Sequence, residues 1–198
     1  MLLTLIRHGE VDGRPQVLRG RTDDELSTVG HQQMKDIIET VNPNFNAIVT
    51  SPMKRCHMFA ASLSEQRQVP LHIVDQLREI DFGDWENMTL AEAEAHDSQC
   101  FHTFKHDTEH WQPPAGEPYS TFRQRVRSAL DSIMALNSSH VLAITHGGVV
   151  RAIIAECLQL TPASAARIGI PLAGLCQLWI DEDGKGSLLR LQWIERPC

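Results

Sequence analysis

The sequence predicts an α/β fold: a three-layer α/β/α sandwich with a mostly parallel central sheet and a helical lid insertion. Short apolar runs rich in β-branched residues alternate with helical segments over the first 74 residues. Two such runs, residues 1–6 and 141–145, are each followed within two residues by a histidine and then a glycine. The chain of 198 residues, 42% hydrophobic and 22% charged, is suited to one globular unit. We therefore expect a single domain over residues 1–198.

The first half of the predicted sheet is built from three strands and two helices. The strands are short buried runs at residues 1–6, 47–50 and 71–74. The first helix is expected from Thr28 to Thr40, with Ser27 as its N-cap. The second is expected to begin at Pro52, because proline suits the first helical position and Ser51 can cap it.

The alternation of strands and helices breaks after the third strand. Residues 89–110 are helix-prone but polar, and residues 112–116 form a proline- and glycine-containing loop. We expect a lid-like insertion at about residues 86–118, over one end of the sheet. The regular pattern then returns, with helices at 119–136 and 148–160, a strand at 141–145, and a hairpin of residues 175–180 and 188–194.

Composition excludes several classes of function. The net charge of -7, with no long run of lysine or arginine, argues against nucleic-acid binding. No apolar run approaches the roughly 20 residues of a membrane span, and the N-terminal run is too short for a signal peptide. The five cysteines are scattered and include no CxxC pair, which indicates reduced thiols and a cytoplasmic protein.

The loop after the first strand is locally cationic. The segment from Arg7 to Arg21 also contains Arg14 and Arg19, against only two acidic residues. A cationic patch in an acidic protein is typical of a binding site for a small anion.

Residues suited to phosphoryl transfer follow the ends of four predicted elements. Arg7 and His8 follow the first strand, Arg55 lies at the start of the helix after the second, Glu79 follows the third, and His146 follows residues 141–145. The carboxyl ends of parallel strands meet at one edge of a sheet. A neutral imidazole can attack phosphorus, arginine binds phosphate oxygens through its planar fork, and a carboxyl group can protonate the leaving alkoxide.

These residues belong to four motifs that occur in a fixed order. They are Arg7-His8-Gly9-Glu10 with the segment 20–30, then Ser51-Pro52-Met53-Lys54-Arg55, then the segment 77–86, then the segment 145–151. Together they span most of the chain, and the sequence resembles the histidine phosphatase (phosphoglycerate mutase-like) superfamily.

The resemblance implies a role for each matching position. His8 would carry the phosphoryl group, Arg7, Arg55 and His146 would hold its oxygens, and Glu79 would act as general acid and then as base for water. Substrate-binding residues would also include Arg14, Gly20, Arg21, Thr22 and Gly147. Arg14 stands where many members have an asparagine that contacts phosphate. No metal and no organic cofactor is expected.

Within the superfamily, the chain is most similar to the alpha-ribazole phosphatases of cobalamin biosynthesis. The short length, Phe82-Gly83-Asp84-Trp85-Glu86 and Pro114-Ala115-Gly116-Glu117 are typical of the phosphatase branch. The implied substrate is a small-molecule phosphomonoester, alpha-ribazole 5′-phosphate first. A broad-specificity phosphatase or a phosphoglycerate mutase remains an alternative, and either a monomer or a homodimer remains open.

Two further hypotheses assign the chain to other classes of protein. His102, His106 and His110, spaced by four residues, could ligate a metal, but no HExxH pattern is present and a solvated helix is favoured. A non-catalytic phospho-ligand binder would typically have lost the nucleophile or an arginine, and this chain has kept both.

Overall fold

The computed structural model describes residues 1–41 and 44–192 and shows a six-stranded sheet in the order β3-β2-β4-β1-β5-β6. The first four strands of that order are parallel, β5 runs antiparallel to β1, and β6 runs antiparallel to β5. The strands are β1 (Leu2–Arg7), β2 (Ala47–Thr50), β3 (Leu71–Ile73), β4 (His140–Thr145), β5 (Leu175–Ile180) and β6 (Gly186–Gln192). The predicted, mostly parallel α/β sheet is confirmed.

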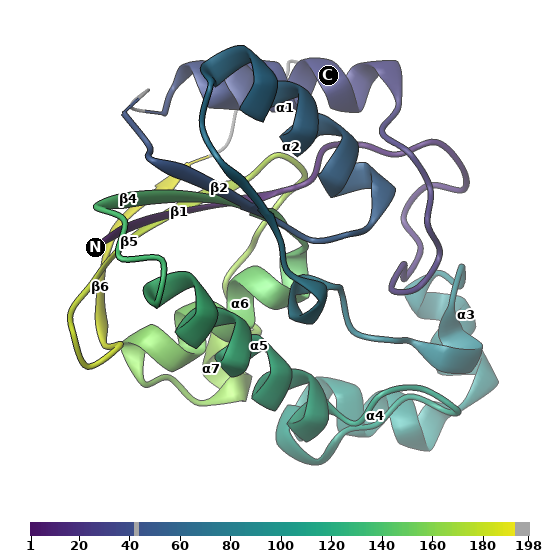
Figure 1. The fold of residues 1–198 in the computed structure, drawn as a ribbon. Helices are drawn as coiled ribbons and strands as arrows, with labels where there is room; N and C mark the ends of the chain where they lie inside the picture. Colours follow the sequence, from purple (N-terminus) through teal and green to yellow (C-terminus); the bar gives the residue numbers. More distant parts are fainter. Residues whose placement is uncertain (42–43, 193–198) are drawn as a thin grey trace.

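Helices cover both faces of this sheet, as Figure 1 shows. One face carries α1 (Thr28–Glu39) and α2 (Lys54–Arg67), and the other carries α5 (Tyr119–Met134), α6 (Gly147–Leu158) and the short α7 (Pro162–Ala165). The remaining two helices, α3 (Leu90–His96) and α4 (Ser98–His106), lie to one side of the sandwich. The three-layer arrangement predicted from the sequence is thus present. None of the helices in the described part of the chain is long and apolar enough to cross a membrane.

The central strands are apolar on both sides because each side packs against helices. In β4, Val141 and Ala143 belong to the core shared with α5 and α6, whereas Leu142 and Ile144 belong to the core shared with α1 and α2. All six residues of β4 are buried. A strand buried on both faces has a continuous apolar sequence instead of an alternating one.

The register of β1 and β4 places the two histidine motifs side by side. Arg7 is opposite Thr145, and the His8 backbone N–H donates to the Thr145 carbonyl over 2.9 Å. The next residue of each strand segment is therefore a histidine at the same carboxyl edge of the sheet.

The first helix begins as predicted, but the second does not. Ser27 caps α1 by accepting a hydrogen bond from the Gly30 N–H. The expected start of α2 at Pro52 with a Ser51 cap was wrong, since α2 begins at Lys54 after Met53. The carboxylate of Asp23 accepts from the Lys54 N–H over 2.8 Å, so a residue from the loop after β1 satisfies this helix end and the Ser51 hydroxyl is used elsewhere.

Residues 86–118, which we call the insertion, are fixed to the fold by aromatic packing. The buried Trp85 ring lies 5.9 Å from Phe101, 6.2 Å from Phe104 and 5.8 Å from Trp111, measured between centroids. Helix α3 begins with a capping box of Thr89 and Glu92. These contacts give the polar insertion its own apolar anchor.

The C-terminal hairpin is present as β5 and β6, although β6 begins at Gly186, two residues earlier than expected. Residues 193 and 194 of the expected hairpin lie outside the described residues. Helix α7, capped by Thr161 with Pro162 in its first turn, was not predicted.

Candidate active site

His8 is held as a neutral imidazole with one free nitrogen. Its Nδ1 lies 2.8 Å from the Gly9 carbonyl oxygen, which can only accept, so the proton resides on Nδ1 and the Nε2 lone pair is free. Burial, followed by the charges of Arg7 and Arg55, holds the pKa of His8 well below its usual value. The side chain is 7% exposed and can still be reached from solvent.

His146 is fully buried beside His8, and the two rings lie 5.3 Å apart at an interplanar angle of 66°. Arg55 Nε donates to His146 Nδ1 over 3.2 Å, so the proton of this neutral ring resides on Nε2, which donates to the Ser51 hydroxyl over 2.8 Å. Burial, then Arg55 and His8, lowers the pKa of His146 well below its usual value. The hydroxyl that was expected to cap α2 therefore orients this histidine.

Arg7 and Arg55 bring two buried guanidinium groups to the histidine pair. Arg7 donates to the Ile170 carbonyl over 2.7 Å, and its side chain packs against Gly147, where an added Cβ would come within 3.4 Å of it. Arg55 is fully buried and donates to the carbonyls of Thr22 and Gly20 over 2.5 and 3.0 Å. Burial lowers the pKa of both guanidinium groups from their usual value, and the carboxylate of Glu79 opposes that shift in each.

Glu79 lies at the N-terminus of α6. Its Oε2 accepts from the Gly148 N–H over 2.8 Å, and its Oε1 accepts from the Ile80 N–H over 3.0 Å. A Cβ at position 148 would lie 2.3 Å from Oε1, so only glycine leaves room for the carboxylate. This position brings Glu79 to the helix turn that directly follows His146.

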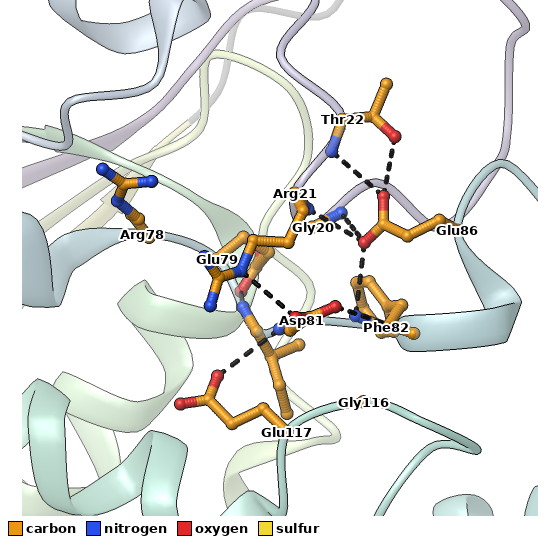
Figure 2. Close-up of polar contacts among 12 residues, drawn as sticks. Gly20, Arg21, Thr22, Arg78, Glu79, Asp81, Phe82, Glu86, Gly116 and Glu117 are labelled. Carbon is orange, nitrogen blue, oxygen red and sulfur yellow. Dashed lines mark hydrogen bonds and ion pairs between the residues drawn. The ribbon is translucent and has the colours of Figure 1, made fainter.

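Glu86 binds the loop of residues 20–22, as Figure 2 shows, and the same loop holds Arg55. Its carboxylate accepts from the backbone N–H groups of Gly20, Arg21 and Thr22 over 2.9, 2.9 and 3.1 Å. It also accepts from the Thr22 hydroxyl over 2.7 Å. The amides of this loop are thus bound to Glu86, while its carbonyls bind Arg55.

The structure brings His8, Arg7, Arg55, His146, Glu79 and Gly147 together but directs two other predicted residues elsewhere. The half-exposed Arg14 forms an ion pair with Glu92 over 2.7 Å. The exposed Arg21 pairs with Asp81 over 3.2 Å. No role was predicted for Glu86, because the loop residues that it binds lie more than 60 residues away along the chain.

Arg125 of α5 fixes the backbone that carries Glu79. Its terminal nitrogens, Nη1 and Nη2, donate to the carbonyls of Gln76, Arg78 and Glu79 over 2.7, 2.6 and 3.0 Å. Its Nε and Nη2 form a bidentate pair with the Glu117 carboxylate over 2.7 and 2.8 Å. All five N–H groups of the guanidinium therefore have acceptors.

We expect Arg125→Lys to lower the free energy of unfolding by about 1–3 kcal/mol, because an ammonium group cannot reach all of these acceptors at once. Denaturant unfolding followed by circular dichroism measures the change. Arg127→Lys is the matched control on the same helix, since Arg127 is exposed and makes only an ion pair with Glu156 over 3.3 Å. Equal stability of the Arg125→Lys variant and the native chain would contradict this assignment.

The three histidines considered as metal ligands do not share one helix. His102 and His106 lie on α4 with ring centroids 4.4 Å apart, but His110 lies beyond the end of that helix and hydrogen bonds to Asp107 over 2.9 Å. Within residues 1–41 and 44–192, no group of three or more His, Cys, Asp or Glu side chains is arranged to hold a metal ion.

Comparisons with known proteins agree with this geometry. The chain belongs to the histidine phosphatase superfamily (branch 1), whose family profile matches residues 3–193. It is 28% identical over 168 residues to the adenosylcobalamin/alpha-ribazole phosphatase of Escherichia coli strain K12, covering 83% of this chain and 82% of that protein.

Two solved structures have the same fold. The alpha-ribazole phosphatase from Shigella flexneri superimposes with a TM-score of 0.84 at 25% identity, covering 96% of each chain. A mycobacterial glucosyl-3-phosphoglycerate phosphatase superimposes with a TM-score of 0.83 at 26% identity, covering 94% of this chain and 96% of that one. The chain is therefore a phosphatase enzyme, and the hypothesis of a non-catalytic binding protein is set aside.

Proposed function

We propose that the chain is a phosphomonoesterase that acts through a phosphohistidine at His8. The Nε2 lone pair attacks phosphorus, and a P–N bond forms as the ester P–O bond breaks. Glu79 gives its proton to the departing alkoxide and then, as a carboxylate, takes a proton from water. The oxygen of that water attacks phosphorus, the P–N bond breaks, and inorganic phosphate leaves.

The observation that carries this proposal is the orientation of His8. Its Nδ1 is bound to the Gly9 carbonyl, which leaves Nε2 as the reacting atom beside the buried Arg55 and the partly buried Arg7. Arg7 and Arg55 supply donors for the phosphoryl oxygens, and their two charges offset the charge that develops there. His146 holds an oxygen in this proposal when its Nε2–H turns from the Ser51 hydroxyl to the phosphoryl group. These side chains can do this without a metal or an organic cofactor.

Alpha-ribazole 5′-phosphate is our first candidate for the substrate. The names of the Escherichia coli and Shigella flexneri relatives support this choice. In this proposal residues 1–198 act as one domain, and the insertion of residues 86–118 serves as a lid over the alcohol part of the substrate. Contacts from the insertion to the loop after β1, such as Glu92 to Arg14, support that role.

We expect alpha-ribazole 5′-phosphate to be hydrolysed with a higher kcat/KM than 3-phosphoglycerate or p-nitrophenyl phosphate. Phosphate release from a panel of phosphomonoesters, with the His8→Ala variant as blank, measures this ranking. A flat ranking would instead assign a general phosphatase. Rapid interconversion of 3- and 2-phosphoglycerate would assign a mutase that still uses His8.

A further inference from the structure

The arginines of the loop after β1 are each neutralised by a carboxylate in space. The sequence window from Arg7 to Arg21 is cationic, but three of its arginines are in ion pairs: Arg14 with Glu92 over 2.7 Å, Arg19 with Asp24 over 2.6 Å, and Arg21 with Asp81 over 3.2 Å. Two of the three carboxylates come from the segment after β3, which faces this loop. The positive charge that the sequence indicates in this loop is therefore neutralised by carboxylates in the folded chain.

The backbone donors of the same loop are also occupied. Three successive N–H groups, at residues 20–22, could bind an anionic group of a substrate, but the Glu86 carboxylate already accepts from all three (Figure 2). A substrate carboxylate or second phosphate would have to displace this internal one.

The balance of charge around the phosphoryl centre is negative. We call residues 9–27 and 81–92 together the rim, because the first segment holds Arg55 and the second follows Glu79. Residues 9–27 contain three arginines and five carboxylates. Residues 81–92 add four carboxylates and no lysine or arginine. With Lys54, which pairs with Glu25 over 3.2 Å, included among the cations, the rim still carries five more negative than positive charges. Arg7 and Arg55 attract the phosphoryl group itself, while the rim repels any further negative charge.

We propose that this rim selects phosphomonoesters whose alcohol part carries no second negative charge. The inference rests on the proposed phosphatase function and adds a substrate class to it. A carboxylate on the alcohol part of a substrate would find the arginines of the rim already paired. It would therefore either lack a cationic partner or have to break an ion pair of the rim. Neutral sugars, ribosides and polyols avoid both costs.

Glycerol 3-phosphate and 3-phosphoglycerate test this selection directly, because both are primary phosphate esters of three carbons and differ in a hydroxymethyl group against a carboxylate. We expect kcat/KM for glycerol 3-phosphate to exceed that for 3-phosphoglycerate by about tenfold at low salt. We also expect the ratio to shrink at 0.5 M NaCl, where charges at the exposed rim are screened. Equal kcat/KM values, or a ratio unaffected by salt, would overturn the inference.

Asp81→Asn should lower this ratio on the order of fivefold, because it frees Arg21 to meet the substrate carboxylate. The asparagine oxygen can still accept the hydrogen bond that Asp81 Oδ1 receives from the Gly83 N–H. Glu92→Gln, which frees Arg14 and keeps the capping box of α3, should change the ratio in the same direction. Because each ratio compares two substrates on one enzyme, a general loss of activity cancels.

Asp131→Asn is the matched control. Asp131 is an exposed residue of α5 that lines a hollow with Lys185 of the β5–β6 turn, at the opposite edge of the sheet. Its ratio should equal that of the native chain. If neither Asp81→Asn nor Glu92→Gln changes the ratio, the inference about the rim is overturned while the proposed phosphatase function stands. By contrast, undiminished hydrolysis in the His8→Ala variant would overturn the proposed phosphohistidine function.

Discussion

Replacing His8 by alanine is expected to lower kcat for every phosphomonoester by about 10⁴ or more, because the proposed mechanism has no other phosphoryl acceptor. The fold should persist, since His8 makes a single side-chain hydrogen bond, to Gly9. Brief reaction of the native enzyme with a phosphate ester labelled in the phosphoryl group, followed by an acid-free quench, should leave label on the protein. The His8→Ala variant should remain unlabelled.

The same substitution at His96, an exposed residue at the end of α3, is the matched control and should retain both activity and label. Because burial and Arg7 lower the pKa of His8, its imidazole remains neutral well below pH 6.5. We therefore expect no loss of labelling between pH 8 and pH 6.5 from protonation of the nucleophile. Label or full turnover in the His8→Ala variant would refute the mechanism.

Glu79→Gln is expected to reduce hydrolysis of alkyl phosphates by about 10² to 10⁴, the usual effect of removing a general acid. The loss should be smaller for p-nitrophenyl phosphate, because nitrophenolate leaves without needing a proton. The glutamine carbonyl can still accept the hydrogen bond that Gly148 donates to Glu79, so the local backbone should hold. The measurement is kcat for both substrates in native and variant enzymes.

Glu94→Gln, an exposed position on α3, makes the same chemical change away from His8 and should leave both rates unaltered. Equal losses on the two substrates in Glu79→Gln would show that Glu79 only positions neighbouring groups. In that case the loss of the acceptor for the Ile80 N–H and of the negative charge near Arg7 and Arg55, and not proton transfer, would account for the effect.

The succession of strands and helices along the chain and the identity of the central residues could be predicted because both depend on local patterns. Apolar runs predict β1 and β4. His8 and His146 directly follow these two parallel strands, so both histidines lie at the same edge of the sheet. Arg55 was expected in the first turn of the second helix and lies there, although that helix begins two residues late.

The failures share one physical origin, which is pairing between residues distant in sequence. Asp23 replaces Ser51 at the start of α2 from 31 positions away. The cationic appearance of the loop after β1 is lost through Asp81 and Glu92, 60 and 78 positions from their arginines. Charge counted in a window of sequence cannot include partners that only the fold supplies.

The place of β1 between β4 and β5 has a consequence for the synthesis of this protein. Leu2 pairs with His140 on one side and with Trp179 on the other, so the first strand made has no partner until late in translation. During that time the chain can pair β2 with β3 but cannot build the centre of its sheet. The ribosome therefore releases His8 long before His146, the ring that lies beside it in the folded chain, so the candidate active site cannot assemble until β4 and the turn after it have emerged.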